Sequence, residues 1–169
     1  MMIAMIPDRL LNSIIGSLQE IDFENIIKEG RKLIGYNPSG DRTLQFDQRI
    51  ELKLAEILRE CGYEGEIRGE EKPSYSGNKN KGISIIDPVD GSINALRGLP
   101  FYAILIAFSE RDDINSINKA IVYAPALKKT YIAIRNQGAI MISKNEERKI
   151  KINEETPISH LINLSLIHI

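Results

Sequence analysis

The chain has 169 residues, of which 43% are apolar and 27% charged, with a formal net charge of −1. This composition is typical of a soluble globular domain with one core, and the near-zero charge excludes a broad basic surface for binding nucleic acid. Short, charge-interrupted apolar runs predict no membrane span, and the start, MMIAMIPDRL, lacks the pattern of a signal peptide. The single cysteine, Cys61, cannot form an internal disulfide, which favours a reducing cytoplasm.

The N-terminal third predicts helices. Apolar residues recur at helical spacing over 8–34, and Asp8 can cap the start of the first helix. A second helical piece is expected over 22–33, ending near Gly35. A polar loop, NPSGD, follows at 37–41.

A further helix is expected over 44–61, with Gly62 as its C-terminal stop. Beyond it the pattern is that of strands, namely GEIRGE, GISIID, FYAILIAFSE, KAIVYAPA, KTYIAIRN, AIMIS and RKIKI. The links RDDINS, LKK, NQG and KNEE are too short for parallel crossovers, so we expect a mostly antiparallel meander. The predicted fold class is therefore α+β, with N-terminal helices packed on that sheet in a single domain over 1–169. The apolar segment LINLSLIHI, 161–169, is expected to be a strand that either pairs inside the sheet or lacks a partner segment.

The segment GISIIDPVDGSIN, 82–94, runs from a strand into two nearby aspartates, Asp87 and Asp90. Pro88 fixes one backbone angle and Gly91 permits a tight turn, so a rigid bend can aim both carboxylates and the carbonyl of Val89 at one point. Such an all-oxygen cluster suits Mg²⁺, and a cation would relieve the repulsion between the acids.

The residues after this bend can bind phosphate. Gly91 and Ser92 begin a possible helical piece, and N–H groups at a helix start bind phosphate well. DPVDG alone fits a plain turn equally well. GEE at 69–71 alone is more typical of a solvated edge, and NPSGDRTLQFD at 37–47 alone of a loop and a helix cap.

Taken in order, NPSGD–T–FD, GEE and DPVDGSIN resemble the inositol monophosphatase superfamily of Mg²⁺-dependent phosphomonoesterases, which includes fructose-1,6-bisphosphatases and nucleotide-type phosphatases. NPSGDRTLQFDQRIE is most similar to archaeal members with both inositol monophosphatase and fructose-1,6-bisphosphatase activity. The resemblance covers roughly residues 30–142. It implies the front portion of a layered αβαβα sugar-phosphatase fold.

The resemblance also implies a metal-binding set. Glu70, Asp87 and the Val89 carbonyl would hold a first Mg²⁺, and Asp87 would bridge to a second, shared with Asp90. Glu71 would lie nearby, oriented by water. Mn²⁺ is expected to substitute for Mg²⁺.

The remaining implied roles concern the phosphate and the attacking water. Gly91 and Ser92 would offer N–H groups to the phosphate, and the Ser92 hydroxyl, paired with Asp47, would help deprotonate a metal-activated water. Asp41 and Thr43 lie on a loop that resembles the family's mobile catalytic loop, and Asp41 would help hold a third metal.

The sequence departs from the family pattern in three places. Ser92 stands where threonine is commoner, and Ala95 where an aromatic residue is usual. The family's later Trp-Asp-x-Ala-type motif, which completes the second metal site, has no counterpart here, and the chain contains no tryptophan. We therefore expect the N-terminal portion of a metal-dependent phosphatase, with the C-terminal subdomain absent.

The predicted activity is Mg²⁺-dependent hydrolysis of inositol 1-phosphate, fructose 1,6-bisphosphate or both. The alternatives are an inactive or split fragment that only binds metal or phosphate or dimerises, and a 3′-phosphoadenosine-type nucleotide as substrate. The expected partner is a small sugar or polyol phosphate, with no nucleic acid polymer and no membrane, in a homodimer or larger assembly. His160 and His168 are expected to have no catalytic role.

Overall fold

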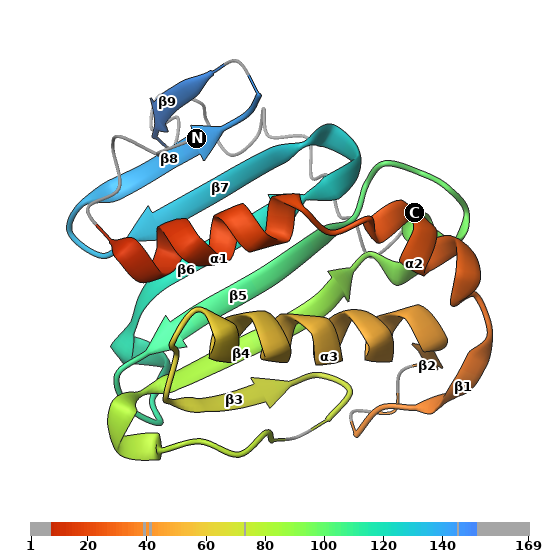
Figure 1. Ribbon diagram of the computed structural model, residues 1–169, viewed down its shortest axis with the longest axis horizontal. Helices are drawn as coiled ribbons and strands as arrows, with labels where there is room; N and C mark the ends of the chain where they lie inside the picture. Colours follow the sequence, from red (N-terminus) through yellow and green to blue (C-terminus); the bar gives the residue numbers. More distant parts are fainter. Residues whose placement is uncertain (1–7, 39, 41, 73, 145, 152–169) are drawn as a thin grey trace, which may run out of the picture.

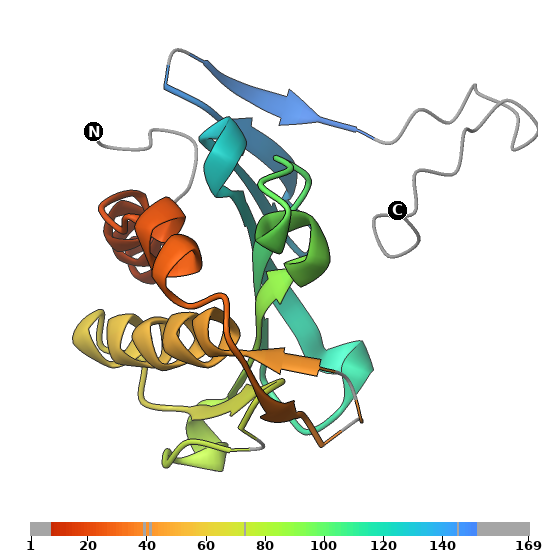
Figure 2. The same cartoon turned by 90° about the vertical axis from the view of Figure 1, so that its right-hand side faces the viewer.

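The computed structural model in Figure 1 describes residues 8–38, 40, 42–72, 74–144 and 146–151. Three helices, α1 (Arg9–Gln19), α2 (Phe23–Glu29) and α3 (Gln45–Glu60), lie on one face of a twisted sheet, as Figure 2 shows edge-on. The predicted α+β class, with N-terminal helices packed on a mostly antiparallel sheet, is confirmed.

The main sheet has seven strands in sequence order. They are β3 (Glu66–Gly69), β4 (Ile83–Asp90), β5 (Ala103–Ser109), β6 (Ile117–Ala124), β7 (Lys129–Ile134), β8 (Gly138–Ile142) and β9 (Glu147–Ile150). From β4 to β9 every pairing is antiparallel, and from β5 onward the short links require it. β3 and β4 pair in parallel, and the long link over 70–82 makes this crossover possible. Short helical elements lie between the strands: α4 (Ser92–Leu96) and 3-10 turns at Lys79–Lys81, Ile114–Ser116 and Pro125–Leu127.

The first helix is fixed at its start and along its inner face. The Asp8 side chain accepts hydrogen bonds from Leu10 N at 3.0 Å and Leu11 N at 3.2 Å, as predicted for an N-cap. Its other oxygen accepts from Lys119 Nζ of β6 at 2.5 Å, which ties the helix to the sheet. The inner face is apolar and buried, at Leu11, Ile14, Ile15 and Leu18.

The second helix is shorter than predicted. It ends at Glu29 instead of running through Leu33 to end near Gly35, and Leu33–Tyr36 form β1, which pairs with β2 (Arg42–Leu44). Gly30 explains the early end, because a Cβ there would lie 2.7 Å from the backbone N of Phe46. The chain turns away from the helix at this contact and returns as a strand.

The fourth strand is longer than predicted. The sequence places its end at Asp87, but the strand continues to Asp90 with a register irregularity. Asp87 faces Leu105 and Asp90 faces Ala103, so β4 has one residue more than β5 between these pairs, as in a β-bulge. Pro88, which has no N–H to donate, sits within this irregularity, where a ladder can tolerate it.

The core lies between the helices and the sheet. α3 contributes Phe46, Ile50, Leu54 and Leu58, all 0% exposed, and packs against β4. Cys61 at the C-terminal cap of α3 is partly buried, with its Sγ 3.8 Å from Ser17 Oγ. In the part of the chain that the structure describes, no helix has the length and apolar character needed to cross a bilayer. LINLSLIHI, His160 and His168 lie outside the described residues.

Candidate functional site

Four segments meet beside the end of β4. They are the β1–β2 hairpin, the start of α3, the loop after β3 and the β4–α4 turn, which come together on the right of Figure 1. Each carries one part of the predicted site, and the contacts below join them. Three motifs that are far apart in sequence therefore come to one corner of the fold.

The first group contains Asp87, Glu70 and Asp90. The pKa of Asp87 is raised to about 7, chiefly because the carboxyl is buried, and further by the negative charges of Glu70 and Asp90 and a hydrogen bond with Glu70. Asp87 Oδ1 accepts from Val89 N at 3.1 Å, which fixes the bend. Asn37 Nδ2 donates to Glu70 Oε1 at 3.0 Å, so the hairpin loop contacts the same group. Asp87 therefore lies close enough to both Glu70 and Asp90 to be repelled by their charges.

The second group links α3 to the β4–α4 turn. Asp47, 2% exposed, accepts from Leu44 N at 2.9 Å and from the Ser92 hydroxyl at 2.8 Å. The Val89 carbonyl oxygen also lies 2.8 Å from Ser92 Oγ. A serine hydroxyl has one proton, so Ser92 donates to one of these acceptors at a time and keeps lone pairs for another donor. The predicted Ser92–Asp47 pairing is thus present.

Burial dominates the electrostatics of Asp47. It raises the pKa of this carboxyl to about 6, against the lowering effect of the hydrogen bonds from Leu44 N and Ser92. The negative charges of Glu70 and Glu51 raise it further. A carboxyl with this pKa can accept a proton near neutral pH.

The third group joins the hairpin to the loop after β3. The Thr43 hydroxyl of β2 donates directly to Glu71 Oε2, whereas the sequence predicts that water orients Glu71. The pKa of Glu71 is raised to about 7, first by burial and then by the charges of Asp47, Glu70 and Glu51. Asp41, the other predicted residue of this loop, lies outside the described residues.

The turn after β4 has the conformation that the sequence predicts. Gly91 adopts a φ of +89° and precedes α4, in which the amides of Asn94 and Ala95 donate to the Gly91 carbonyl. A Cβ at Gly91 would lie 2.8 Å from the Phe101 carbonyl oxygen, so both the backbone angle and the space require glycine. Ala95, buried at 3% exposure, packs in the core below this turn.

The predicted metal ligands offer suitable atoms. Glu70, Asp87, Asp90 and the Val89 carbonyl present only oxygen, which Mg²⁺ and other hard cations prefer. Within the described ranges, no three acidic, histidine or cysteine side chains are gathered tightly enough to hold an ion as they stand. The donor chemistry therefore fits a divalent cation, and the metal-binding roles of these residues stay predictions.

Three further polar residues belong to the site by contact and were not predicted. Asn37 bonds Glu70, and Glu51, fully buried on α3, accepts from the backbone after Glu70 and from Tyr75 Oη at 2.8 Å. Glu51 lies four residues after Asp47, on the helix face that also carries Ile50, Leu54 and Leu58. A glutamate on an apolar helix face was the signal that could have revealed it.

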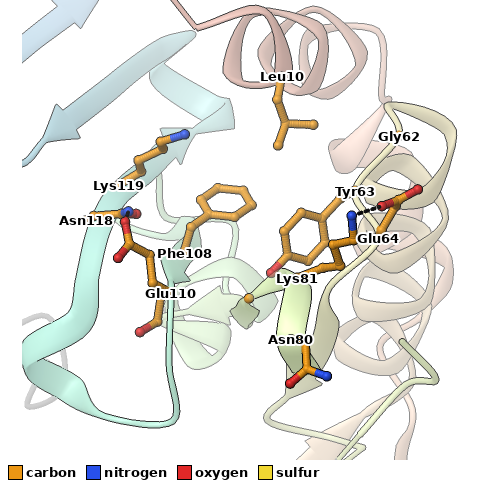
Figure 3. Close-up of a pocket in the computed structure, with 12 residues that line it drawn as sticks. Leu10, Gly62, Tyr63, Glu64, Asn80, Lys81, Phe108, Glu110, Asn118 and Lys119 are labelled. Atoms are coloured by element: carbon orange, nitrogen blue, oxygen red, sulfur yellow. Dashed lines mark hydrogen bonds and ion pairs between the residues drawn. The ribbon is translucent and has the colours of Figure 1, made fainter. Parts of the chain in front are cut away.

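A separate cavity of about 480 Å³ lies near the other end of β4, between α1, the turn after α3, and strands β5 and β6. Figure 3 shows Tyr63 and Phe108 at its centre, with ring centroids 5.5 Å apart, and Lys119 and Leu10 at its rim. Gly82 on its wall is five residues from Asp87, roughly 16 Å along a strand. None of the predicted site residues lines this cavity.

The comparisons with known proteins agree with the arrangement of motifs. The sequence pattern of the inositol monophosphatase family matches residues 18–169. A fructose-1,6-bisphosphatase of Pyrococcus furiosus is 30% identical over 144 residues, 82% of this chain. This chain belongs to the inositol monophosphatase family. The family and these relatives are phosphatases.

Two further comparisons give the same result. A fructose-1,6-bisphosphatase/inositol-1-monophosphatase of Methanocaldococcus jannaschii is 30% identical over 149 residues, 86% of this chain. A solved inositol monophosphatase–fructose 1,6-bisphosphatase matches the fold with a TM-score of 0.62 and 28% identity, over 85% of this chain and 55% of that one. The chain spans about half the length of the curated relatives it matches, 54% and 55% for the two archaeal proteins.

Proposed function

We propose that the corner at the end of β4 hydrolyses phosphate monoesters with Mg²⁺, and that the substrate is inositol 1-phosphate, fructose 1,6-bisphosphate or both. The observation that carries the proposal is the Asp47–Ser92 hydrogen bond of 2.8 Å, placed beside Asp87, whose carboxyl is repelled by the charges of Glu70 and Asp90. The names of the archaeal relatives support this substrate class.

In this proposal Glu70, Asp87, Asp90 and the Val89 carbonyl hold two or three Mg²⁺ ions, with Asp41 contributing to the third, and Mn²⁺ substitutes. When bound, Mg²⁺ neutralises the charge of the ester and lowers the pKa of water. Because the charges of Glu70 and Asp90 raise the pKa of Asp87, a bound cation would also relieve this repulsion.

The other residues orient the reactants. The Ser92 oxygen accepts a hydrogen bond from the attacking water while its own proton points to Asp47 Oδ1, so Ser92 takes the proton that the water loses and passes its own proton to Asp47. The N–H groups of Gly91 and Ser92 face the phosphate in this arrangement. The Thr43 hydroxyl donates to the Glu71 carboxylate, and this bond links the β1–β2 hairpin to the loop after β3.

The direct test is phosphate release by the purified chain from inositol 1-phosphate and fructose 1,6-bisphosphate. Release that needs Mg²⁺, stops with a chelator and falls at least about 100-fold in Asp87→Asn would support the proposal. Glu56→Gln, which removes an exposed carboxylate elsewhere on α3, is the matched control and should leave the rate unchanged. Release that survives Asp87→Asn would contradict the assignment.

A second candidate function follows from the length of the match. Because the chain spans about half of its relatives, we propose as the alternative that it is the N-terminal portion of such an enzyme and acts only as a metal- or phosphate-binding or dimerisation module. Calorimetry with Mg²⁺ and sedimentation would separate the two. Heat of binding without phosphate release from sugar phosphates or a 3′-phosphoadenosine-type nucleotide would favour the module.

The wider setting is part of the same proposal. We place the activity in the cytoplasm, on small sugar or polyol phosphates, in a homodimer or larger assembly. Sedimentation of the purified chain measures the assembly directly, and a monomer at all accessible concentrations would contradict that part.

A further inference from the structure

We infer that Glu51 is a positioning residue that fixes the loop carrying Glu70 and Glu71, and this inference rests on the proposed function of that loop. Glu51 lies on α3, one helical turn after Asp47, and is 0% exposed. A fully buried carboxylate is rare unless its oxygens are bonded. Here both oxygens are used, and all the donors come from the segment after β3.

The contacts of Glu51 define what it holds. Its Oε2 accepts from the backbone N of Glu71 at 2.7 Å, and its Oε1 accepts from the backbone N of Lys72 at 2.9 Å. Oε1 also accepts from the Tyr75 hydroxyl at 2.8 Å. One side chain thus binds two consecutive amides, together with a third donor a few residues further along the chain.

The bond to the Glu71 amide acts on Glu70. The N–H of Glu71 and the carbonyl of Glu70 belong to one planar peptide unit. Anchoring that N–H therefore fixes the Cα of Glu70 and the direction in which its side chain leaves the backbone. In this position the Glu70 carboxyl contacts Asp87 and accepts a hydrogen bond from Asn37, beside the end of β4.

Gly69 is needed for the close approach of the Glu51 carboxylate to the loop. A Cβ on Gly69 would lie 2.1 Å from the carboxyl carbon of Glu51 and 2.3 Å from both of its oxygens. Only a residue without a side chain lets the carboxylate come this close to the loop. The glycine of the GEE motif therefore makes room for Glu51, and the two glutamates that follow serve the site.

A carboxylate is required because all the partners are donors. Glutamine at position 51 has nearly the same shape but presents one accepting oxygen and one NH₂ group. Whichever way it turns, at least one of the three donors faces an NH₂ group and loses its bond. Glu51→Gln therefore loosens the loop with little change of volume.

The test measures the loop and the metal separately. In Glu51→Gln, hydrogen exchange of the Glu71 and Lys72 amides, followed by NMR, should accelerate at least about tenfold, and Mn²⁺ affinity should fall about tenfold, as for other residues that support metal ligands. Gly69→Ala should produce the same two changes by displacing the carboxylate. Glu56→Gln, an exposed carboxylate on the same helix, is the control and should change neither.

Each outcome decides a separate point. Unchanged exchange of both amides in folded Glu51→Gln would overturn the inference. Should that variant not fold, the unaltered chain decides: slow exchange of the Glu71 and Lys72 amides and a scalar coupling from them to the Glu51 carboxyl carbon support it, and fast exchange overturns it. Absence of Mn²⁺ binding by the unaltered chain would count against the proposed function. The hydrogen-exchange result alone would then decide whether Glu51 fixes the loop.

Discussion

At the scale of single residues, burying Asp47, Glu71 and Asp87 beside the end of β4 costs free energy of folding when they are ionised. Asp47, Glu71 and Asp87 all have a raised pKa, and for each the largest cause is burial. Their hydrogen bonds to Ser92, Thr43 and Val89 N lower the pKa and offset only part of that cost. Side chains held against their preferred ionisation state are common at functional sites, because the same arrangement favours a bound cation.

The Ser92 hydroxyl should contribute measurably to stability. In Ser92→Ala the buried Asp47 carboxylate loses one of its bonds, so we expect a loss of about 1–2 kcal/mol in the free energy of unfolding. Ser92→Thr keeps the hydroxyl and is the control, with an expected loss below about 0.5 kcal/mol. Urea unfolding followed by circular dichroism measures both. Equal stability of Ser92→Ala and the unaltered chain would show that this bond is not formed.

The sequence revealed the residues whose motifs match the family pattern, including the Asp47–Ser92 pair, and gave no role to Asn37 and Glu51 beside them. Asp87, Asp90 and Ser92 lie within six residues of one another, and Asp47 and Thr43 share a second short stretch. Asn37 and Glu51 contact the loop after β3 from elements that lie far away in sequence. Their roles depend on tertiary contacts, which local spacing does not encode.

At the scale of elements, the β4–α4 connection determines where the site residues point. The irregularity at Pro88–Val89 turns the strand, and Gly91 starts the helix with a backbone angle that other residues rarely adopt. Asn94 reinforces the turn, since its Nδ2 donates to the Phe101 carbonyl at 2.9 Å.

Alanine at position 91 should therefore be strongly destabilising. It imposes the strained φ of +89° on a residue with a side chain and places a Cβ 2.8 Å from a carbonyl oxygen, for an expected loss of about 2–4 kcal/mol. Gly98→Ala is the matched control, since Gly98 has φ +74° but no atom within 4 Å of the place where a Cβ would lie, and about 1 kcal/mol is expected. Thermal unfolding compares them. Equal losses would assign the whole effect to the backbone angle.

Helix α1 gives a second prediction at this scale. Asp8 both caps the helix and pairs with Lys119 at 2.5 Å, and the ion pair together with the cap bonds lowers the pKa of Asp8 against the effect of burial. Asp8→Ala should cost about 1–2 kcal/mol, whereas Lys119→Met, which keeps the cap, should cost under about 1 kcal/mol. Chemical unfolding measures both. A larger effect of Lys119→Met would show that the ion pair, not the cap, dominates.

Elements with a clear period were predictable, and their ends were not. The apolar spacing of α1 and α3 and the alternation from β5 to β8 reflect burial against a single core, so these elements were found. Leu33–Tyr36 is only four residues long and mostly exposed, and it follows a helix without a local break other than Gly30. Whether it extends the helix or forms a hairpin is decided by the contact of Gly30 with Phe46, which no local pattern reveals.

At the scale of the whole molecule, the helices cover one face of the sheet and the acidic corner lies at the edge of this layer (Figures 1 and 2). Two carboxyls outside this corner have a lowered pKa instead. Asp112 has a pKa lowered by its hydrogen bonds and charge pairing with Arg68, and the pKa of Glu66 is lowered by Arg68, Ser74 and Lys79 against the effect of burial. The chain therefore contains two sets of carboxyls that respond to pH in opposite directions.

The balance between these sets predicts how stability depends on pH without added metal. The acids of the corner have folded pKa values of about 6 to 7, above their ordinary values of 3.8 to 4.5. Between about pH 4 and pH 7 the folded chain therefore binds more protons than the unfolded chain, so the free energy of unfolding falls as pH rises. Asp112 and Glu66 act below about pH 4, where protonation removes their stabilising contacts. Stability should be greatest near pH 4 to 5.

Urea unfolding at about pH 4.5 and about pH 7.5 in the presence of a chelator tests this balance. The midpoint should be lower at the higher pH, and Asp87→Asn should reduce the difference because it removes an acid with a raised pKa and relieves its repulsion with Glu70. Glu56→Gln, which changes an exposed carboxylate, should leave the difference intact. Added Mg²⁺ should raise the midpoint at pH 7.5 in the unaltered chain and fail to do so in Asp87→Asn, since a ligand that binds only the folded state stabilises it by mass action. A midpoint that rises steadily from pH 4.5 to 7.5 without metal would mean that the acids of the corner are not held in the buried, mutually repelling arrangement described here.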